Sequence, residues 1–223
     1  LNSLAIPDSV TSIGKGAFQE CINLASVTIP VSITSISDNA FFECNSLTAV
    51  SIPDSVTSIG AGAFCKCGSL KNIAIPDSVT SIGEAAFSDC NSLESIAIPD
   101  SVTNISNHTF VSCSNLTSVT IPNSVTSISK RAFLKCRSLT SIVIPDSVIS
   151  IGDSAFEGCN FSSFTVPKTV KKVGKSSLRG CKEITVYDSI DPDAKPCKNH
   201  SDGYHGTPNA SLGTVVNYFT NIN

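Results

Sequence analysis

The sequence predicts an α/β but mainly β solenoid of about eight 23-residue repeats, and two regularities carry this prediction. Prolines recur every 23 residues from Pro7 to Pro145, and an eighth follows one residue early, at Pro167. A cysteine stands 14 residues after each of these prolines, from Cys21 to Cys181. A fixed period of roughly 20 to 50 residues is typical of chains whose repeats stack on one another. Each repeat then packs only on its neighbours, without a single central core.

The segment before each proline predicts a β-strand. Residues 24–30 read Leu-Ala-Ser-Val-Thr-Ile-Pro. The apolar Val27 and Ile29 alternate with Ser26 and Thr28, which is the period of a strand with one buried face. Proline has no N–H to give to a ladder, so it ends the strand. Stacked copies would form a parallel sheet with strands about 4.8 Å apart.

The segment after each proline predicts a hydrogen-bonded bend. Residues 53–60 read Pro-Asp-Ser-Val-Thr-Ser-Ile-Gly, with Val56 and Ile59 expected to point inward. Buried backbone groups at a bend need partners, so we expect the hydroxyl two residues after each proline to bond the adjacent turn. The residues concerned are Ser9, Ser32, Ser55, Ser78, Ser101, Ser124, Ser147 and Thr169. Glycine or serine ends the bend, which favours a positive φ angle there.

An Ala-Phe-x-x-Cys motif completes each repeat. Residues at i, i+1 and i+4 fit the inner face of one helical turn, so we expect short helical turns on the convex side. The phenylalanines should form a buried spine: Phe18, Phe41, Phe64, Phe87, Phe110, Phe133 and Phe156. The recurrent cysteines point the same way in a stack, which is poor geometry for disulfides, so we expect free buried thiols. Cys65 lies off this ladder, where other repeats carry Gln19, Ser88 or Glu157, and is predicted to be an exposed thiol able to cross-link.

Once strand and turn are both defined, residues 1–187 resemble the BspA-like (Treponema pallidum type) class of leucine-rich repeats. The Leu-x-x-Val-x-Ile-Pro strand and the Ser-Val-Thr-Ser-Ile-Gly-x-x-Ala-Phe-x-x-Cys turn carry the resemblance. It implies a right-handed solenoid with a concave parallel β-sheet. It also implies a secreted or cell-surface protein that adheres to host proteins or other cells. Binding residues in this class are not encoded by the motif, so none is transferred.

Two domains are predicted: the solenoid, 1–187, and a C-terminal extension, cap or linker, 188–223. The repeats degenerate after Cys159, and the extension is rich in proline and glycine apart from a strand-like stretch at 213–219. Because the chain contains no Met, we expect the parent protein to be longer or processed. No apolar run approaches the roughly 20 residues that span a bilayer, so we expect no membrane insertion.

Charge is unevenly distributed along the chain. Residues 1–129 carry a net charge of −7, residues 130–182 carry +7 and residues 183–223 carry −3. One interpretation of this pattern is ordinary solvated surface, and the other is head-to-tail association or a basic docking site at the C-terminal end.

No catalytic, metal or cofactor site is predicted. His108 is the only histidine within the repeats, and no phosphate-binding glycine loop is present. Cys197, His200 and His205 lack a fourth ligand at standard zinc spacing. We therefore expect a non-enzymatic protein without cofactors.

The leading hypothesis is a binding or adhesion module that uses its concave face to contact protein or glycan ligands on other cells or matrix. The candidate residues on that face are Ser26, Thr28, Ser51, Lys71, Asn72, Glu94, Ser95, Ser118, Thr120, Ser141 and Val143. This face lacks the Tyr, Trp and Arg anchors of tight interfaces, so weak multivalent binding is expected. We expect no nucleic-acid partner.

Two alternatives remain open. Open solenoid ends could stack into a homo-oligomer with a structural role, and free thiols are compatible with an intracellular interaction scaffold. The Asn-x-Ser/Thr sequons predict glycosylation only if a eukaryote secretes the protein. They lie at Asn104, Asn107, Asn115, Asn160, Asn199 and Asn209.

Overall fold

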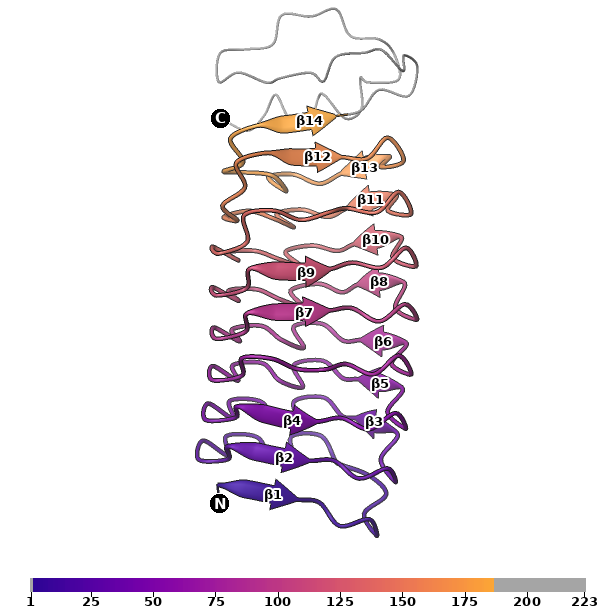
Figure 1. The fold of residues 1–223 in the computed structure, drawn as a ribbon, viewed down its shortest axis with the longest axis vertical. Helices are drawn as coiled ribbons and strands as arrows, with labels where there is room; N and C mark the ends of the chain where they lie inside the picture. The colour runs from indigo at the N-terminus through magenta and orange to yellow at the C-terminus, as the bar shows by residue number, and fades with distance from the viewer. Residues whose placement is uncertain (1, 187–223) are drawn as a thin grey trace, which may run out of the picture.

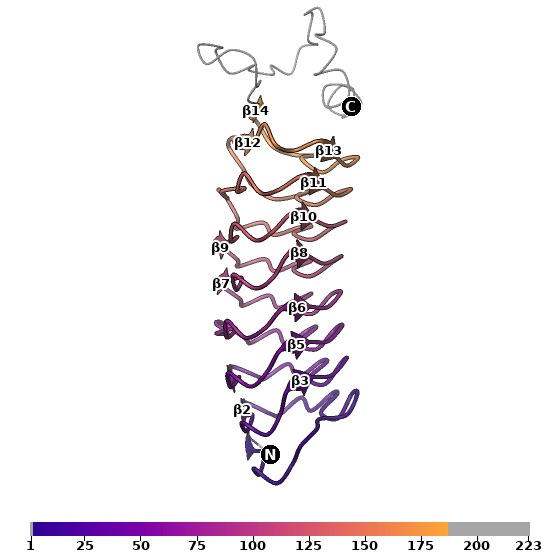
Figure 2. The same ribbon diagram turned by 90° about the vertical axis from the view of Figure 1, so that its right-hand side faces the viewer.

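The protein, seen in a computed structural model that describes residues 2–186, is a column of stacked coils (Figure 1). We number the coils 1 to 8 from the prolines that begin them, Pro7 to Pro167. Two ladders of parallel strands run up different sides of the column (Figures 1 and 2). The column is nearly straight in both views, and we call the surface formed by the longer strands the strand face. The predicted 188–223 extension, including 213–219, lies outside the described residues.

The strands of the strand face have three residues each and stand just before the prolines. They are β1 (Ser3–Ala5), β2 (Ser26–Thr28), β4 (Ala49–Ser51), β7 (Ser95–Ala97), β9 (Ser118–Thr120), β12 (Phe164–Val166) and β14 (Ile184–Val186). Equivalent residues pair in parallel, as Val27 does with Val50. Residues 72–74 and 141–143 are not strands, so the ladder divides into the sheets β1-β2-β4, β7-β9 and β12-β14.

The second ladder consists of two-residue strands after the prolines. They are β3 (Ser35–Ile36), β5 (Ser58–Ile59), β6 (Ser81–Ile82), β8 (Asn104–Ile105), β10 (Ser127–Ile128), β11 (Ser150–Ile151) and β13 (Lys172–Val173). Their isoleucines and Val173 are buried, and a single bridge joins Ile13 to Ile36 below them. Strand and bend therefore fall where the 23-residue pattern predicts them.

The predicted helical turn is wrong. Gly16 and Glu20 have φ angles of 63° and 60°, and the equivalent pair recurs in each coil in the left-handed region. A left-handed residue interrupts an α-helix. Amides here alternate between two partners: Ala17 donates back to Gly14 at 3.1 Å, whereas Phe18 donates to Ala40 of the next coil at 2.8 Å. The segment is a flat ribbon bonded between coils.

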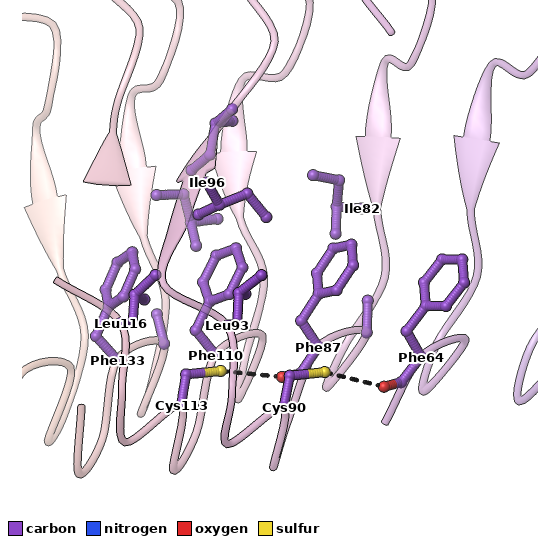
Figure 3. Packing of buried hydrophobic residues seen from close by; sticks show 14 of the residues in the cluster. Phe64, Ile82, Phe87, Cys90, Leu93, Ile96, Phe110, Cys113, Leu116 and Phe133 are labelled. Atoms are coloured by element: carbon purple, nitrogen blue, oxygen red, sulfur yellow. Dashed lines mark hydrogen bonds between the residues drawn. The ribbon is translucent and has the colours of Figure 1, made fainter. Parts of the chain in front are cut away.

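Phenylalanine rings form the predicted spine through the centre of the column. Neighbouring rings from Phe18 to Phe156 stack nearly parallel, with centroids 5.2 to 5.7 Å apart. Figure 3 shows the same geometry with leucines and isoleucines packed beside the rings. Burying an aromatic side chain contributes a few kcal/mol, and stacking adds about 0.5–1.5 kcal/mol per pair.

The recurrent cysteines form a second buried ladder along the rings. Each thiol from Cys44 to Cys159 donates to the carbonyl of a phenylalanine 26 residues earlier. Cys113 and Cys90 do so at 3.1 Å (Figure 3). All nine cysteines among the described residues are free thiols, six of the eight in the ladder being buried, whereas Cys21 is exposed and Cys181 half-buried. The predicted buried thiol ladder is confirmed for coils 2 to 7.

The hydroxyl ladder is also confirmed. Ser55 Oγ donates to the carbonyl of Ile33 at 2.7 Å, and the same bond recurs from Ser32 to Thr169. The expected positive φ at the following glycine is wrong. A Cβ on Gly60 would lie 2.5 Å from the amide nitrogen of Asp38, so glycine there permits close approach between coils.

Candidate binding surfaces

The strand face exposes almost all of the predicted candidates. Ser26 is half-buried beside Ser3, whose hydroxyl it bonds at 2.9 Å. The remaining ten are exposed: Thr28, Ser51, Lys71, Asn72, Glu94, Ser95, Ser118, Thr120, Ser141 and Val143. They come from successive coils and therefore lie in rows one coil apart. Whether they bind a ligand stays a prediction.

The chemistry of this face is small and mostly neutral. Thr48 and Thr117 each bond a backbone carbonyl of the coil below at 3.0 Å, which fixes part of the hydroxyl surface. Lys71 and Glu94 supply opposite charges on adjacent coils. Val143, 82% exposed, is an apolar contact point where the strand ladder is interrupted. The face can offer hydrogen bonds over a long area but no large aromatic anchor.

The prediction of an exposed thiol at Cys65 is wrong, because the residue is only 8% exposed. Phe42 and Ser88 occupy the equivalent positions of the coils before and after, and coils this close cover a small side chain between them. Burial, assisted by the nearby carboxylate of Asp89, raises the pKa of the Cys65 thiol. Cys65 is therefore a poor nucleophile for cross-linking.

Four of the six sequons fall within the described residues. Asn107, Asn115 and Asn160 are exposed. Asn104 is half-buried, and its side-chain oxygen accepts bonds from Ser127 at 2.6 Å and Ser129 at 3.0 Å. Asn199 and Asn209 lie outside the described residues, as do Cys197, His200 and His205. Glycosylation stays a prediction.

A second surface is formed by the ribbon segments 8 to 15 residues after each proline, and we call it the turn face. In coils 1–5 these segments carry five acidic and two basic residues, a net charge of −3 with His108 neutral. In coils 6–8 they carry seven basic and two acidic residues, a net charge of +5. The change from negative to positive net charge along the chain is visible in the sequence, and the fold places the charged side chains of these segments on one surface.

Ion pairs on the turn face also differ between the two groups of coils. Lys15 pairs with Asp38 at 3.7 Å and Lys66 pairs with Glu43 in coils 1–3. In coils 6–8 the sole ion pair among residues 2–186 joins Arg179 to Glu157, at 3.4 Å. The other basic side chains of that group are exposed and pair with no other described residue: Lys130, Arg131, Lys135, Arg137, Lys175 and Lys182.

The described part of the chain holds no cluster of three His, Cys, Asp or Glu side chains arranged to bind a metal. His108 contacts Glu84 through Nδ1 at 3.2 Å on the exposed turn face. Within residues 2–186 no helix has the length and apolar character needed to cross a membrane.

Burial controls the chemistry of the thiol ladder. It raises the pKa of Cys44 from 9.0 to about 11, and it raises the pKa values of Cys67, Cys90 and Cys113 further. Thiols with raised pKa values stay protonated near neutral pH and are poor nucleophiles and metal ligands. Their role is to pack and to donate to phenylalanine carbonyls.

The coil geometry agrees with a match to a protein family. The family described as BspA type leucine rich repeat region (6 copies) matches residues 1–117 and 103–189, nearly the whole solenoid. The chain belongs to this family. The predicted resemblance is thus confirmed, and the recurrent prolines, phenylalanines and cysteines are the positions that build its coils.

Solved structures of bacterial leucine-rich repeat proteins are similar over most of the chain. A leucine-rich repeat protein from Bacteroides ovatus is 33% identical with a TM-score of 0.79, covering 83% of this chain and 49% of its own length. A leucine rich cell surface protein from Faecalibacterium prausnitzii is 29% identical with a TM-score of 0.65, covering 91% and 52%. A T. pallidum leucine-rich repeat protein is 29% identical with a TM-score of 0.65, covering 81% and 76%.

The chain spans about half the length of the first two of these proteins. No significant match was found among curated proteins.

Proposed function

We propose that the chain is a non-enzymatic binding or adhesion module that works at the cell surface or outside the cell, with the strand face as its ligand surface. The observation that carries the proposal is the contrast between recurrent and varied positions. The recurrent Phe, Cys and Ser side chains of the coils are mostly buried or bonded to the preceding coil. The strand-face side chains vary and are exposed.

Similarity supports the extracellular setting. The structure from Faecalibacterium prausnitzii is named a cell surface protein, and the fold is the same over most of this chain. Parallel coils offer a long surface on which small hydroxyl and amide groups repeat. Protein or glycan ligands with many hydrogen-bonding groups fit such a surface, and each contact is weak because anchors are absent.

Clustering tests this proposal. The chain is presented as a monomer and as a streptavidin-linked tetramer to immobilised fibronectin, laminin and collagen. We expect the tetramer to bind at least one of these proteins by about 100-fold more than the monomer, because linked weak sites gain effective concentration. A one-to-one nanomolar complex, or equal binding of both forms, would contradict weak multivalent recognition.

Matched substitutions locate the surface. Ser95→Gln with Ser118→Gln adds bulk to two paired strand-face positions. Thr11→Gln with Thr103→Gln adds the same bulk at exposed positions after the prolines. The first pair should weaken tetramer binding and the second should leave it unchanged. Loss with the second pair alone would place the ligand elsewhere.

A further inference from the structure

We propose that the turn face of coils 6–8 is a binding site for sulfated polysaccharide, separate from the strand face. Its core is the set of cationic side chains on coils 6 and 8, with Asp153 and Glu157 of coil 7 between them. The proposal does not depend on strand-face binding, since the residues are different and recognition is by positive charge, whereas the strand face offers mostly neutral hydrogen-bonding groups.

The cationic side chains are close enough to act together. The amide of Arg131 donates to the carbonyl of Asp153 at 2.9 Å, and that of Ser154 donates to the carbonyl of Lys175 at 2.8 Å. Three consecutive coils are therefore in direct contact, and coils 6 and 8 lie about 10 Å apart at the usual strand spacing. Several anionic groups of one polysaccharide chain can therefore contact the cationic side chains of coils 6 and 8 at the same time.

The two acidic residues between the rows are already engaged. Asp153 Oδ1 accepts the amide of Lys175 at 2.7 Å, and Glu157 Oε1 pairs with Arg179 at 3.4 Å. Glu157 is half-buried, whereas the basic side chains around it extend into solvent. The field above this surface is thus positive, and it attracts polyanions.

The chemistry of the surface favours sulfate groups on a sugar chain. Arginine forks bind planar pairs of anionic oxygens and lysine acts as a point charge, so the unpaired Arg131 and Arg137 suit sulfate esters. Single-stranded nucleic acid needs exposed aromatic rings for stacking, but Phe133 and Phe156 are buried in the spine.

A membrane surface is a poorer fit for the same cationic groups. Interfacial binding gains much of its strength from apolar side chains that enter the lipid. The exposed large apolar residues among the described ones are Ile22, Val31, Val143 and Ile149, and none lies in the turn face of coils 6–8. A hydrated, flexible polyanion needs only charge and hydrogen-bond donors.

Heparin, as a sulfated probe, tests the proposal on the full chain. Arg131→Asn, Lys135→Asn and Arg137→Gln are combined, asparagine being chosen because Arg131 and Lys135 have φ angles of 56° and 62°. The matched control removes three exposed positive charges from the segment after Pro167, outside both the turn face and the strand face: Lys168→Gln, Lys171→Gln and Lys172→Gln. Thermal melts verify that both variants fold.

We expect the first variant to bind heparin about tenfold more weakly than the unaltered chain near 0.15 M salt, because it loses three ion pairs with sulfate groups. The control should bind less than about twofold more weakly, because its substitutions lie outside the proposed site. Affinity of the unaltered chain should fall steeply with salt, as polyanion binding does. Desulfated heparin and hyaluronan should bind much less.

Equal weakening by the two variants would overturn the site, and equal binding of desulfated heparin would overturn the sulfate preference. Double-stranded DNA binding as tightly as heparin would replace the proposal with a general polyanion surface. None of these outcomes bears on the fibronectin, laminin and collagen experiment, whose substitutions lie outside the turn face.

Discussion

Coil 3 and coil 6 contain nearly the same interior but differ in their exteriors. Phe64 and Phe133 occupy the same place in the spine. The thiols of Cys67 and Cys136 donate to the carbonyls of Phe41 and Phe110, one coil earlier, at 3.2 and 3.1 Å. On the turn face, coil 3 carries one lysine, which is paired, whereas residues 130–137 carry four unpaired cationic side chains. Because neighbouring coils meet through buried groups, surface charge can reverse without disturbing the stack. Binding properties should therefore vary along the column while stability does not.

Truncating a phenylalanine of the spine should have the largest effect on the stability of either coil. Phe64→Ala and Phe133→Ala should each lower the free energy of unfolding by about 3–5 kcal/mol, since both rings are fully buried. Urea denaturation measures the free energy of unfolding of both variants. A clearly smaller loss for Phe133→Ala would show that coil 6 is packed differently from coil 3.

Alkaline pH should weaken both groups of coils through the thiols. Burial raises the folded-state pKa values of Cys44, Cys67, Cys90 and Cys113 above 9.0, and a hydrogen bond with Cys159 together with burial raises that of Cys136, so the stability contributed by these neutral thiols is complete below pH 9. As pH rises above 9, the unfolded chain loses protons that the folded chain keeps, and stability falls by about 1.4 kcal/mol per pH unit for each such thiol. The midpoint of thermal unfolding between pH 8 and 11, at roughly constant ionic strength, reports this loss.

Cys67→Ala and Cys136→Ala sharpen this test, because each removes one buried thiol from an equivalent place. Both should reduce the steepness of the pH dependence by the same amount. An unchanged steepness in either variant would mean that the thiol in that coil is not held neutral.

Removing one rung of the hydroxyl ladder should have a smaller effect. Ser78→Ala and Ser124→Ala delete bonds of 2.7 Å to the carbonyls of Val56 and Val102. Each should cost about 1 kcal/mol, the usual net value of such a bond. Guanidinium denaturation compares them, with Thr103→Ala as a control whose exposed side chain is not part of the ladder. Unequal losses of stability would show that the hydroxyl bonds contribute differently in coil 4 and coil 6.

Changes in surface charge should have the smallest effect on stability. Lys66→Asn removes the ion pair with Glu43 and the ammonium 5.2 Å above the Phe42 ring, so a slight loss is expected at low salt. Lys135→Asn removes a charge from a cationic group and should leave stability unchanged or slightly higher. Thermal melts at low and high salt check this, because the Lys66 effect should fade with screening. A large loss for Lys135→Asn would mean that its side chain has a structural partner.

Much of this architecture could be predicted because it recurs. Val56, Ile59 and Phe64 occupy positions that are apolar in every coil, and a recurrent apolar position in a stacked repeat is buried. The hydroxyl at Ser55 could be assigned for the same reason, since a bend leaves backbone carbonyls without partners.

The remaining features depend on neighbours in space or on backbone geometry. The Ala-Phe-x-x-Cys spacing fits a helical turn equally well, and only the Gly, Asn and Ser residues at Gly16, Asn39, Gly62 and Ser154 hinted at left-handed backbone. Cys65 is buried although the equivalent Gln19 and Glu157 are polar, because burial at this position depends on the coils before and after it. The strand-face candidates are exposed, but a varied polar surface does not identify its ligand.

The bonds that join the coils have a consequence for how the chain acquires its structure. They connect residues 21 to 26 apart, such as Ser55 with Ile33 and Cys90 with Phe64. The two residues of each such contact are separated by about a tenth of the chain length. Chains whose contacts have such short relative separations fold fast. Every new coil can form as soon as its own residues are free, using the coil before it as a template. A chain synthesised or exported from its N-terminus would thus gain order one layer at a time, and the apolar edge left open would never exceed a single coil.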